Sequence, residues 1–272
     1  MALTFIDAVG AAHSNASPDS RIVSLVPSIT ELICDLGLAA QLVGRTKWCI
    51  HPHEVVETIP TIGGTKKVNL DKLRALAPSH VIVNIDENPR EMADAIAEFV
   101  PNVIVTHPVD PRDNLELYRF IGGLFGKAEK AESLCGEFDR AFHDLDSVAH
   151  GLPERRVLYL IWKDPWMTVA SDTYIARTLD LIRWKTIDVG SERYPEIEID
   201  TDLVANLDLV LLSSEPLHFN EGHIQQFSEA FGCPLEKLLL IDGEMTSWYG
   251  SRAIRGLDYV RALAQSLATG GK

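Results

Sequence analysis

Short runs of β-branched and aliphatic residues alternate with helical patterns along most of this chain, and that alternation limits the folds open to it. The runs are Arg21–Leu25, His80–Asn84, Asn102–Thr106, Arg156–Ile161, Leu207–Leu212 and Leu238–Ile241. Strands that are apolar throughout are buried on both faces, as in parallel sheets. The helical patterns between them are Ser28–Leu36, Leu70–Ala77, Pro89–Phe99 and Thr173–Arg183. Strand and helix in alternation predict an α/β architecture.

The middle of the chain breaks this alternation. Residues 112–149 contain no strand pattern, and apolar residues fall on a single helical stripe from Lys127 to Ala149. Such a helix is roughly 35 Å long. We therefore expect two Rossmann-like lobes with parallel sheets, residues 18–112 and 153–272, joined by a linker, residues 113–152, that holds one long α-helix. A single doubly wound sheet is the alternative, and residues 13–20 read as a loose lead-in.

The charge excludes several functions. The chain has 39 acidic and 25 basic residues and a net charge of −14, which repels nucleic acid and anionic lipid. No apolar run approaches the roughly 20 residues that cross a bilayer, so no membrane insertion is expected. Residues 1–12 lack a basic start, and Asp7 interrupts their apolar run, so the sequence as written shows no export signal and indicates a cytoplasmic protein. The four cysteines form no CxxC pair and do not require disulfides.

The common catalytic signatures are missing. The sequence contains no GxxxxGK[ST], GxGxxG, GxSxG or HExxH motif. Their absence makes a binding protein a better hypothesis than an enzyme.

Four tryptophans follow predicted strands at their carboxyl ends. Trp48 comes after a short strand at Leu42–Arg45, Trp162 and Trp166 after the run ending at Ile161, and Trp248 after the run ending at Ile241. Ligands of open α/β sheets bind at that edge. The pattern predicts an aromatic ligand pocket with Tyr249 beside it; the alternative is that these rings fill the core.

Two further groups of residues allow more than one interpretation. Cys49, His51 and His53 lie on one side if the segment is extended, which makes Cys49 and His51 weak candidates for a metal or metal-chelate contact; otherwise His53 opens a short helix. Arg252 and Arg255 share a helix face and suit either ligand anions or salt bridges.

Several segments, in order along residues 20–268, resemble a known family. They are residues 21–32 (RIVSLVPSITEL), Val68–Asp71 before Leu76–Pro78, Tyr194–Ile197 before Asp208–Leu211, and Ser247–Arg252 (SWYGSR). The family is the class III substrate-binding proteins of ABC transporters, also called helical-backbone metal receptors, which include vitamin B12-binding proteins. The resemblance implies two lobes on a long helix, with a ligand cleft walled by Trp48, Trp162 and Trp248.

The resemblance also implies a function. Family members are periplasmic, bind a corrinoid, haem or ferric siderophore, and deliver it to an ABC permease. An acid on each lobe docks onto the permease, and those positions fall on Asp71 and Asp200, where the family usually has glutamate. We expect a corrinoid or another metal chelate as ligand and no cofactor besides it. The alternatives are a cytoplasmic metal-dependent enzyme using Cys49 and His51, and a ligand-binding sensor.

Overall fold

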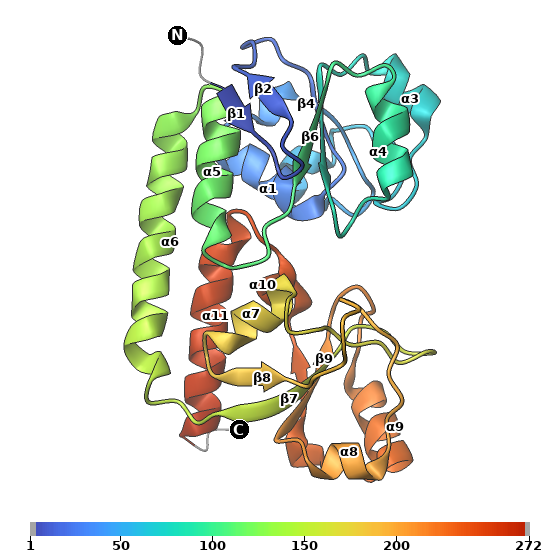
Figure 1. Cartoon of the computed structure of the whole chain (residues 1–272), viewed down its shortest axis with the longest axis vertical. Coiled ribbons are helices and arrows are strands. Elements are labelled where there is room, and N and C mark those ends of the chain that lie inside the picture. The colour runs from blue at the N-terminus through green and yellow to red at the C-terminus, as the bar shows by residue number, and fades with distance from the viewer. Residues whose placement is uncertain (1–3, 270–272) are drawn as a thin grey trace. The chain divides into compact units, whose positions relative to one another are not determined.

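The six apolar runs, together with Leu42–Arg45 and Trp184–Thr186, form two separate four-stranded sheets, and every strand in both sheets is parallel to its neighbours. The computed structural model describes residues 4–269, so the first three residues of the N-terminal segment analysed for an export signal lie outside it. The chain divides into two compact units (Figure 1). Within the described residues the N-terminal lobe comprises residues 4–108, 112–138 and 249–252, and the C-terminal lobe residues 109–111, 139–248 and 253–269.

The sheet of the N-terminal lobe has the order β4-β3-β5-β6. All five residues of β5, HVIVN, are buried, as expected for a central parallel strand. Helix α1 begins at Pro27 with Val26 as its N-cap, not at Ser28 as the sequence suggested. The elements are β3 (Ile22–Ser24), α1 (Pro27–Asp35), η1 (Ala39–Gln41), β4 (Leu42–Arg45), α2 (His53–Val56), α3 (Leu70–Ala75), β5 (His80–Asn84), α4 (Arg90–Ala97), β6 (Asn102–Thr106) and α5 (Asp113–Leu124).

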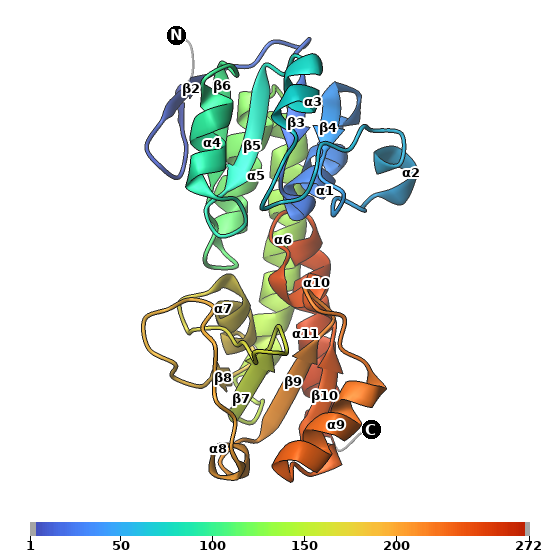
Figure 2. The ribbon, with the colours of Figure 1, turned by 90° about the vertical axis from the view of Figure 1, so that its right-hand side faces the viewer.

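The sheet of the C-terminal lobe has the order β10-β9-β7-β8. A buried cluster that includes Leu160, Leu212 and Phe227 packs helix α9 against this sheet, and Figure 2 shows both. The elements are β7 (Arg155–Leu160), α7 (Tyr174–Asp180), β8 (Trp184–Thr186), α8 (Thr201–Ala205), β9 (Leu209–Ser213), α9 (Glu221–Phe231), η2 (Leu235–Lys237), β10 (Leu238–Ile241), α10 (Gly243–Ser247) and α11 (Arg252–Ala268).

An antiparallel hairpin, β1 (Thr4–Ile6) with β2 (Ala12–Ser14), precedes the first sheet. The Asp7 carboxylate accepts hydrogen bonds from the amides of Val9, Ala11 and Val105, and the Ala8 amide donates to the Val105 carbonyl. The turn of the hairpin is therefore hydrogen-bonded to Val105 on the outer edge of β6, and it covers part of that edge. The expectation of a loose lead-in is wrong at residues 13 and 14, which belong to β2.

Helix α6 (Ala128–Ala149) is the long helix that the apolar stripe predicts, and it starts one residue later than expected. The division of the chain into lobes falls between Phe138 and Asp139 of this helix, so its first half belongs to one lobe and its second half to the other. Two separate parallel sheets and one long helix confirm the two-lobe α/β prediction, and the alternative of a single doubly wound sheet is wrong.

The lobes are not continuous in sequence. The segment 109–111 belongs to the C-terminal lobe although its neighbours belong to the N-terminal one, and Tyr249–Arg252 belongs to the N-terminal lobe although both its neighbours belong to the C-terminal one. The lobe boundaries predicted at residues 112 and 153 do not separate out segments 109–111 and 249–252, because no local sequence feature marks these short segments.

Candidate ligand-binding and docking sites

Trp48 lies just beyond the carboxyl end of β4 and exposes its indole. The residue lies in a turn, where its backbone amide donates a hydrogen bond to Thr46 Oγ1 (3.3 Å). The exposed fraction of Trp48 is 55%. Lys47 Nζ lies 4.5 Å from the centre of the indole ring, a cation–π distance. Gly64 lies alongside the ring, since a Cβ at that position would stand 3.4 Å from the indole Nε1. Trp48 is thus a supported aromatic surface at the edge of the sheet where ligands of this fold class bind.

Cys49 and His51 do not form the extended ligand pair that alternation suggested. The chain turns at Lys47 and Trp48 and bends again before α2, so the two side chains do not project from one strand. The Cys49 thiol is fully buried and hydrogen-bonded to Thr46 Oγ1 (3.1 Å), and burial raises its pKa, which keeps it a neutral thiol. Among residues 4–269, no three His, Cys, Asp or Glu side chains gather in a way that could hold a metal ion.

Tyr249 and Gly250 are anchored within the N-terminal lobe. Tyr249 Oη donates to Glu87 Oε1 (2.6 Å), next to the end of β5. Burial and the nearby Glu87 charge raise the pKa of Tyr249 well above its usual value, so the phenol keeps its proton. Gly250 donates its amide to Asn114 Oδ1 (2.6 Å) and accepts from Tyr118 Oη (2.8 Å). Its φ of 80° and a backbone oxygen 3.0 Å from its would-be Cβ suit glycine there.

Arg252 forms a salt bridge within the protein. Its Nε and Nη2 reach the two carboxylate oxygens of Glu31 at 2.7 and 2.9 Å. The side chains are only 5% and 9% exposed, so this bidentate pair is buried. The guanidinium thus holds the segment 249–252 to α1 within the N-terminal lobe, and the interpretation of Arg252 as a contact for ligand anions has no support in this geometry.

The tryptophans of the C-terminal lobe differ in accessibility. Trp162, directly after β7, is 39% exposed. Trp166 packs against the core of the lobe, stacked on Phe219 at 6.2 Å between ring centres and edge-on to Phe227 and Phe231. Trp248 is buried and donates its indole N–H to Glu215 Oε2 (2.9 Å). Each lobe therefore exposes one indole beyond a strand end, Trp48 in one and Trp162 in the other, and the core alternative describes Trp166 better.

The carboxylates that anchor these rings were not among the predicted site residues. Glu87 and Glu215 each follow a central strand by a few residues and hold Tyr249 and Trp248. An acid after a strand end is the only local signal for them. Glu31 pairs with Arg252 across more than two hundred residues, and no local pattern marks that contact.

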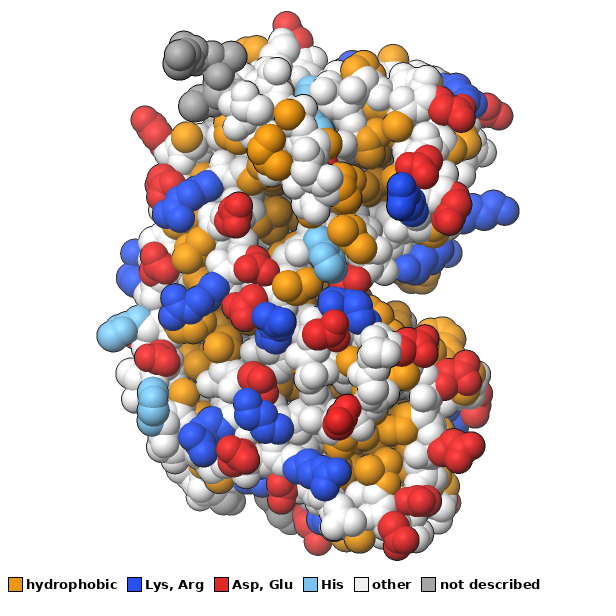
Figure 3. Space-filling view, in the orientation of Figure 1, with side chains coloured by type: hydrophobic (Ala, Val, Ile, Leu, Met, Phe, Trp, Pro, Cys, Tyr) orange, Lys and Arg blue, Asp and Glu red, His pale blue; other side chains and the backbone are white. Residues whose placement is uncertain are grey.

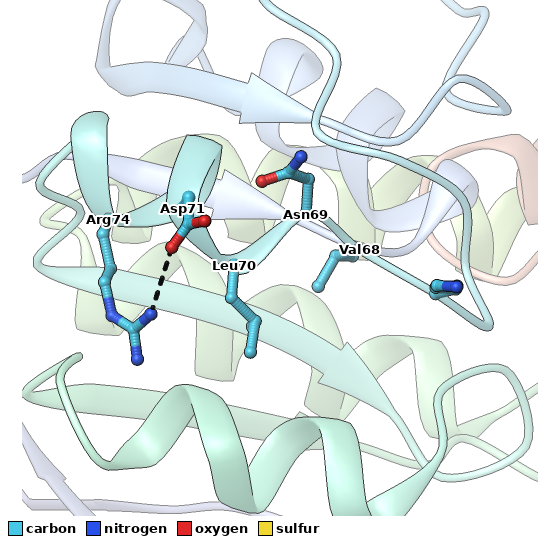
Figure 4. Close-up of a pocket in the computed structure, with 6 residues that line it drawn as sticks. Val68, Asn69, Leu70, Asp71 and Arg74 are labelled. Atoms are coloured by element: carbon cyan, nitrogen blue, oxygen red, sulfur yellow. Dashed lines mark hydrogen bonds and ion pairs between the residues drawn. The ribbon is translucent and has the colours of Figure 1, made fainter.

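The two predicted docking acids are exposed, one in each lobe: Asp71 lies in the short helix α3, and Asp200 directly precedes the short helix α8. Asp71 stands in α3 at the side of an open hollow of about 530 Å³ and reaches Arg74 Nη1 at 3.5 Å (Figure 4). Asp200 precedes α8 and accepts a hydrogen bond from the Leu203 amide (2.7 Å), which makes it the N-cap of that helix. Both carboxylates are at the surface of their own lobes.

Comparison with known proteins identifies the family. Residues 22–229 match the family described as periplasmic binding protein. A Bacillus subtilis protein named as an uncharacterized ABC transporter substrate-binding lipoprotein, YvrC, is 26% identical over 91% of this chain and 79% of its own length. The vitamin B12-binding protein of Vibrio cholerae is 24% identical over 82% of this chain and 80% of its own length. The periplasmic heme-binding protein RhuT from Roseiflexus sp. RS-1 shares the fold, with a TM-score of 0.76, 21% identity, and coverage of 91% of this chain and 98% of its own.

The chain therefore belongs to the periplasmic binding protein family, and the resemblance stated from its motifs is confirmed. It is a substrate-binding protein of the ABC transporter class, whose members bind solutes and do not transform them. The family is periplasmic or lipoprotein-anchored, and the comparisons do not support the cytoplasmic enzyme. Within residues 4–269, none of the helices combines the length and the apolar character needed to cross a membrane.

Proposed function

We propose that this protein binds a corrinoid, or a related metal chelate such as haem or a ferric siderophore, and delivers it to an ABC permease. The observation that carries the proposal is that each lobe exposes one indole, Trp48 or Trp162, directly beyond the carboxyl end of a sheet strand. That edge is where ligands of open α/β sheets bind, and an exposed indole there gives a bulky ligand broad apolar contact.

A corrinoid is the first candidate within this class. A vitamin B12-binding relative matches four fifths of the chain, whereas the heme-binding structure supports the shared fold. In this proposal the metal belongs to the ligand, and the Cys49 thiol, which is buried and neutral, does not contact it. Trp48, Trp162 and the residues around them would bind and orient the ligand without reacting with it.

Calorimetric titration of the purified protein with cyanocobalamin, haemin and a ferric catecholate siderophore tests the proposal. We expect one of the three to bind far more tightly than millimolar. Trp48→Ala and Trp162→Ala should each weaken that binding by about tenfold or more, the equivalent of ~1.4 kcal/mol for each lost ring.

Leu235→Ala is the matched control. Leu235 is also an exposed apolar residue, but it lies just before β10, at the amino end of the strands, and should leave the affinity unchanged. The proposal fails if all three chelates bind no better than millimolar, or if Leu235→Ala weakens binding as much as the tryptophan variants do.

A further inference from the structure

A second hollow, of about 280 Å³, lies between the β1–β2 hairpin, the end of β6 and helix α5, and all of its lining residues belong to the N-terminal lobe. Figure 1 shows these three elements side by side, and Figure 3 shows hydrophobic side chains on the surface over them. Strands β6 and β4 are the two outer strands of the sheet. Three strand spacings, roughly 14 Å, therefore separate this hollow from the strand that leads to Trp48.

The walls of the hollow are mostly apolar. A cavity of about 150 Å³ with apolar walls holds benzene, so the volume of this hollow has room for a phenyl ring with a short chain. The hollow opens to water, and its lining residue Ile6 exposes 57% of its surface. The apolar residues of the walls are Ile6, Ala8, Val105, Pro108, Leu117 and Phe120.

Asp7 holds two of these walls together. Its side chain is fully buried, and its Oδ2 accepts a hydrogen bond from the Val105 amide (3.1 Å) and is hydrogen-bonded to His13 Nε2 (3.1 Å). The hairpin is thereby fixed to β6, and the hollow exists without any rearrangement. A preformed pocket binds a ligand more tightly than one that must first be ordered.

The polar side chains of the hollow that remain for a ligand favour a positive charge. Glu116 is exposed and makes no ion pair with any residue from 4 to 269, and Asp113 lines the hollow three residues earlier in α5. His107 Nε2 is enclosed, has no hydrogen bond within the described chain, and lies 3.4 Å from Asp86 Oδ1. The described residues that line the hollow include no lysine or arginine.

We propose that this hollow is a second ligand site, which takes a small organic cation with an apolar body, such as an arylalkylammonium ion. The apolar body lies against Ile6, Leu117 and Phe120, and the ammonium group pairs with the carboxylate of Glu116. An anion of the same shape is rejected because Asp113 and Glu116 repel it. The site shares no residue with the exposed indoles, so it does not depend on the proposed binding of a metal chelate.

The experiment titrates the full ¹⁵N-labelled chain with 2-phenylethylammonium chloride and follows backbone amides by NMR. We expect saturable shifts confined to residues 6–8, 105–108 and 113–120. Ethylammonium, which lacks the ring, and 3-phenylpropionate, which reverses the charge, should each bind about tenfold more weakly or worse. Glu116→Gln should weaken binding of the phenyl cation by up to about fivefold, since an exposed ion pair is worth up to ~1 kcal/mol. Ala8→Phe should weaken it by about tenfold or more, because the new ring fills the hollow.

Two variants outside the hollow are the matched controls. Glu129 is an exposed acid of α6 in the same lobe without an ion pair to the described residues, and Ala11 is an exposed alanine at the hairpin turn. Glu129→Gln and Ala11→Phe should bind the phenyl cation within about twofold of wild type.

The inference is overturned if 2-phenylethylammonium does not bind at millimolar concentration, if 3-phenylpropionate binds as well, or if the controls weaken binding as much as Glu116→Gln and Ala8→Phe do. It is also overturned if the shifts gather at Trp48 and Trp162, or if cyanocobalamin displaces the cation, since the cation would then occupy the indole surfaces. Ala8→Phe should bind cyanocobalamin as wild type does, and a protein that binds the cation but none of the chelates refutes the proposed chelate alone.

Discussion

At the scale of single residues, the buried pair of Glu31 and Arg252 joins two positions that lie 221 residues apart in the sequence. Both side chains are removed from water, and each neutralises the charge of the other. Breaking such a pair from one side leaves a buried charge uncompensated, whereas removing both charges costs much less.

Arg252→Met should therefore lower the free energy of unfolding by about 3–5 kcal/mol. The double variant Glu31→Leu with Arg252→Met should recover a large part of that loss, because no lone charge remains. Urea unfolding of the two single variants and the double variant measures the coupling. If the losses of the single variants simply add in the double variant, the pair does not stabilise the lobe as described.

His80 predicts a pH dependence of stability. Its ring is buried, lies edge-on to Phe125 with 5.1 Å between ring centres, and is hydrogen-bonded through Nδ1 to Ser79 Oγ (2.9 Å). Burial, with a smaller effect of His13, lowers the pKa of His80 from 6.5 to about 4. Between those two pH values the His80 ring is protonated in the unfolded chain but neutral in the folded one. The free energy of unfolding therefore has its full value above pH 6.5 and falls as the pH drops towards 4.

The expected loss between pH 7 and pH 4 is on the order of 3 kcal/mol at most. His80→Gln removes the titrating group and should flatten this part of the stability–pH profile relative to wild type, as measured by urea unfolding. His53→Gln is the control, because that side chain is exposed and should leave the profile unchanged. Identical slopes for wild type and His80→Gln would contradict the assignment.

The sequence predicts the roles of some single residues and not of others. The positions of Trp48 and Trp162 after strands are visible in the chain, and the structure exposes both indoles. The roles of Trp248 and Arg252 are not visible, because they depend on Glu215 and Glu31, which become their partners only when distant segments fold together. An arginine beside aromatic residues looks the same in sequence whether its partner is a ligand or a buried acid.

At the scale of elements, the packing of α5 on α6 depends on one small residue. A Cβ on Gly122 would lie 2.6 Å from the Ala131 Cβ and 3.1 Å from the Lys127 carbonyl oxygen, closer than atoms pack. Helices α5 and α6 can approach each other this closely at position 122 only because glycine has no side chain.

Gly122→Ala should lower the free energy of unfolding by about 1–3 kcal/mol, since the overpacked helices must separate. A second change, Ala131→Gly, should restore part of the loss by removing the opposing Cβ. Gly151→Ala is the control: its would-be Cβ meets only the Val148 oxygen at 3.5 Å, and its effect should stay within about 0.5 kcal/mol. Thermal denaturation compares the four proteins, and an equal stability of Gly122→Ala and wild type would show that the contact is looser than described.

Elements with a strong period were predictable and short ones were not. The strands β4, β5, β6 and β10 have the bounds that their apolar runs indicate, and α6 follows its stripe to within one residue. The hairpin β1–β2 and strand β8 have three residues in each strand, with polar or exposed positions among them. Their pairing is set by the neighbouring strand rather than by their own pattern, so sequence alone does not reveal them.

At the scale of the whole molecule, the proposed delivery to a permease can be tested separately from ligand binding. Asp71 and Asp200 are exposed acids of different lobes, and neither is part of the tryptophan surfaces. Asp71→Asn with Asp200→Asn removes both charges and keeps the helix cap, because asparagine caps as well as aspartate.

The double variant should bind cyanocobalamin in solution with the affinity of wild type. In cells that express the protein with its permease, uptake of labelled cobalamin should fall by about tenfold or more, as expected when two charge pairs of an interface lose one partner. Lys130→Gln serves as the control for a surface charge change. Undiminished uptake in the double variant would assign docking to other residues.

The return of residues 249–252 to the N-terminal lobe has a consequence for protein engineering. A truncated gene that stops at any point before residue 249 encodes a fragment in which Tyr118 loses the Gly250 carbonyl and the Glu31 carboxylate is stranded without its guanidinium. Neither lobe can be excised by a single cut in the chain, and a miniaturised version of the N-terminal lobe has to include those four residues.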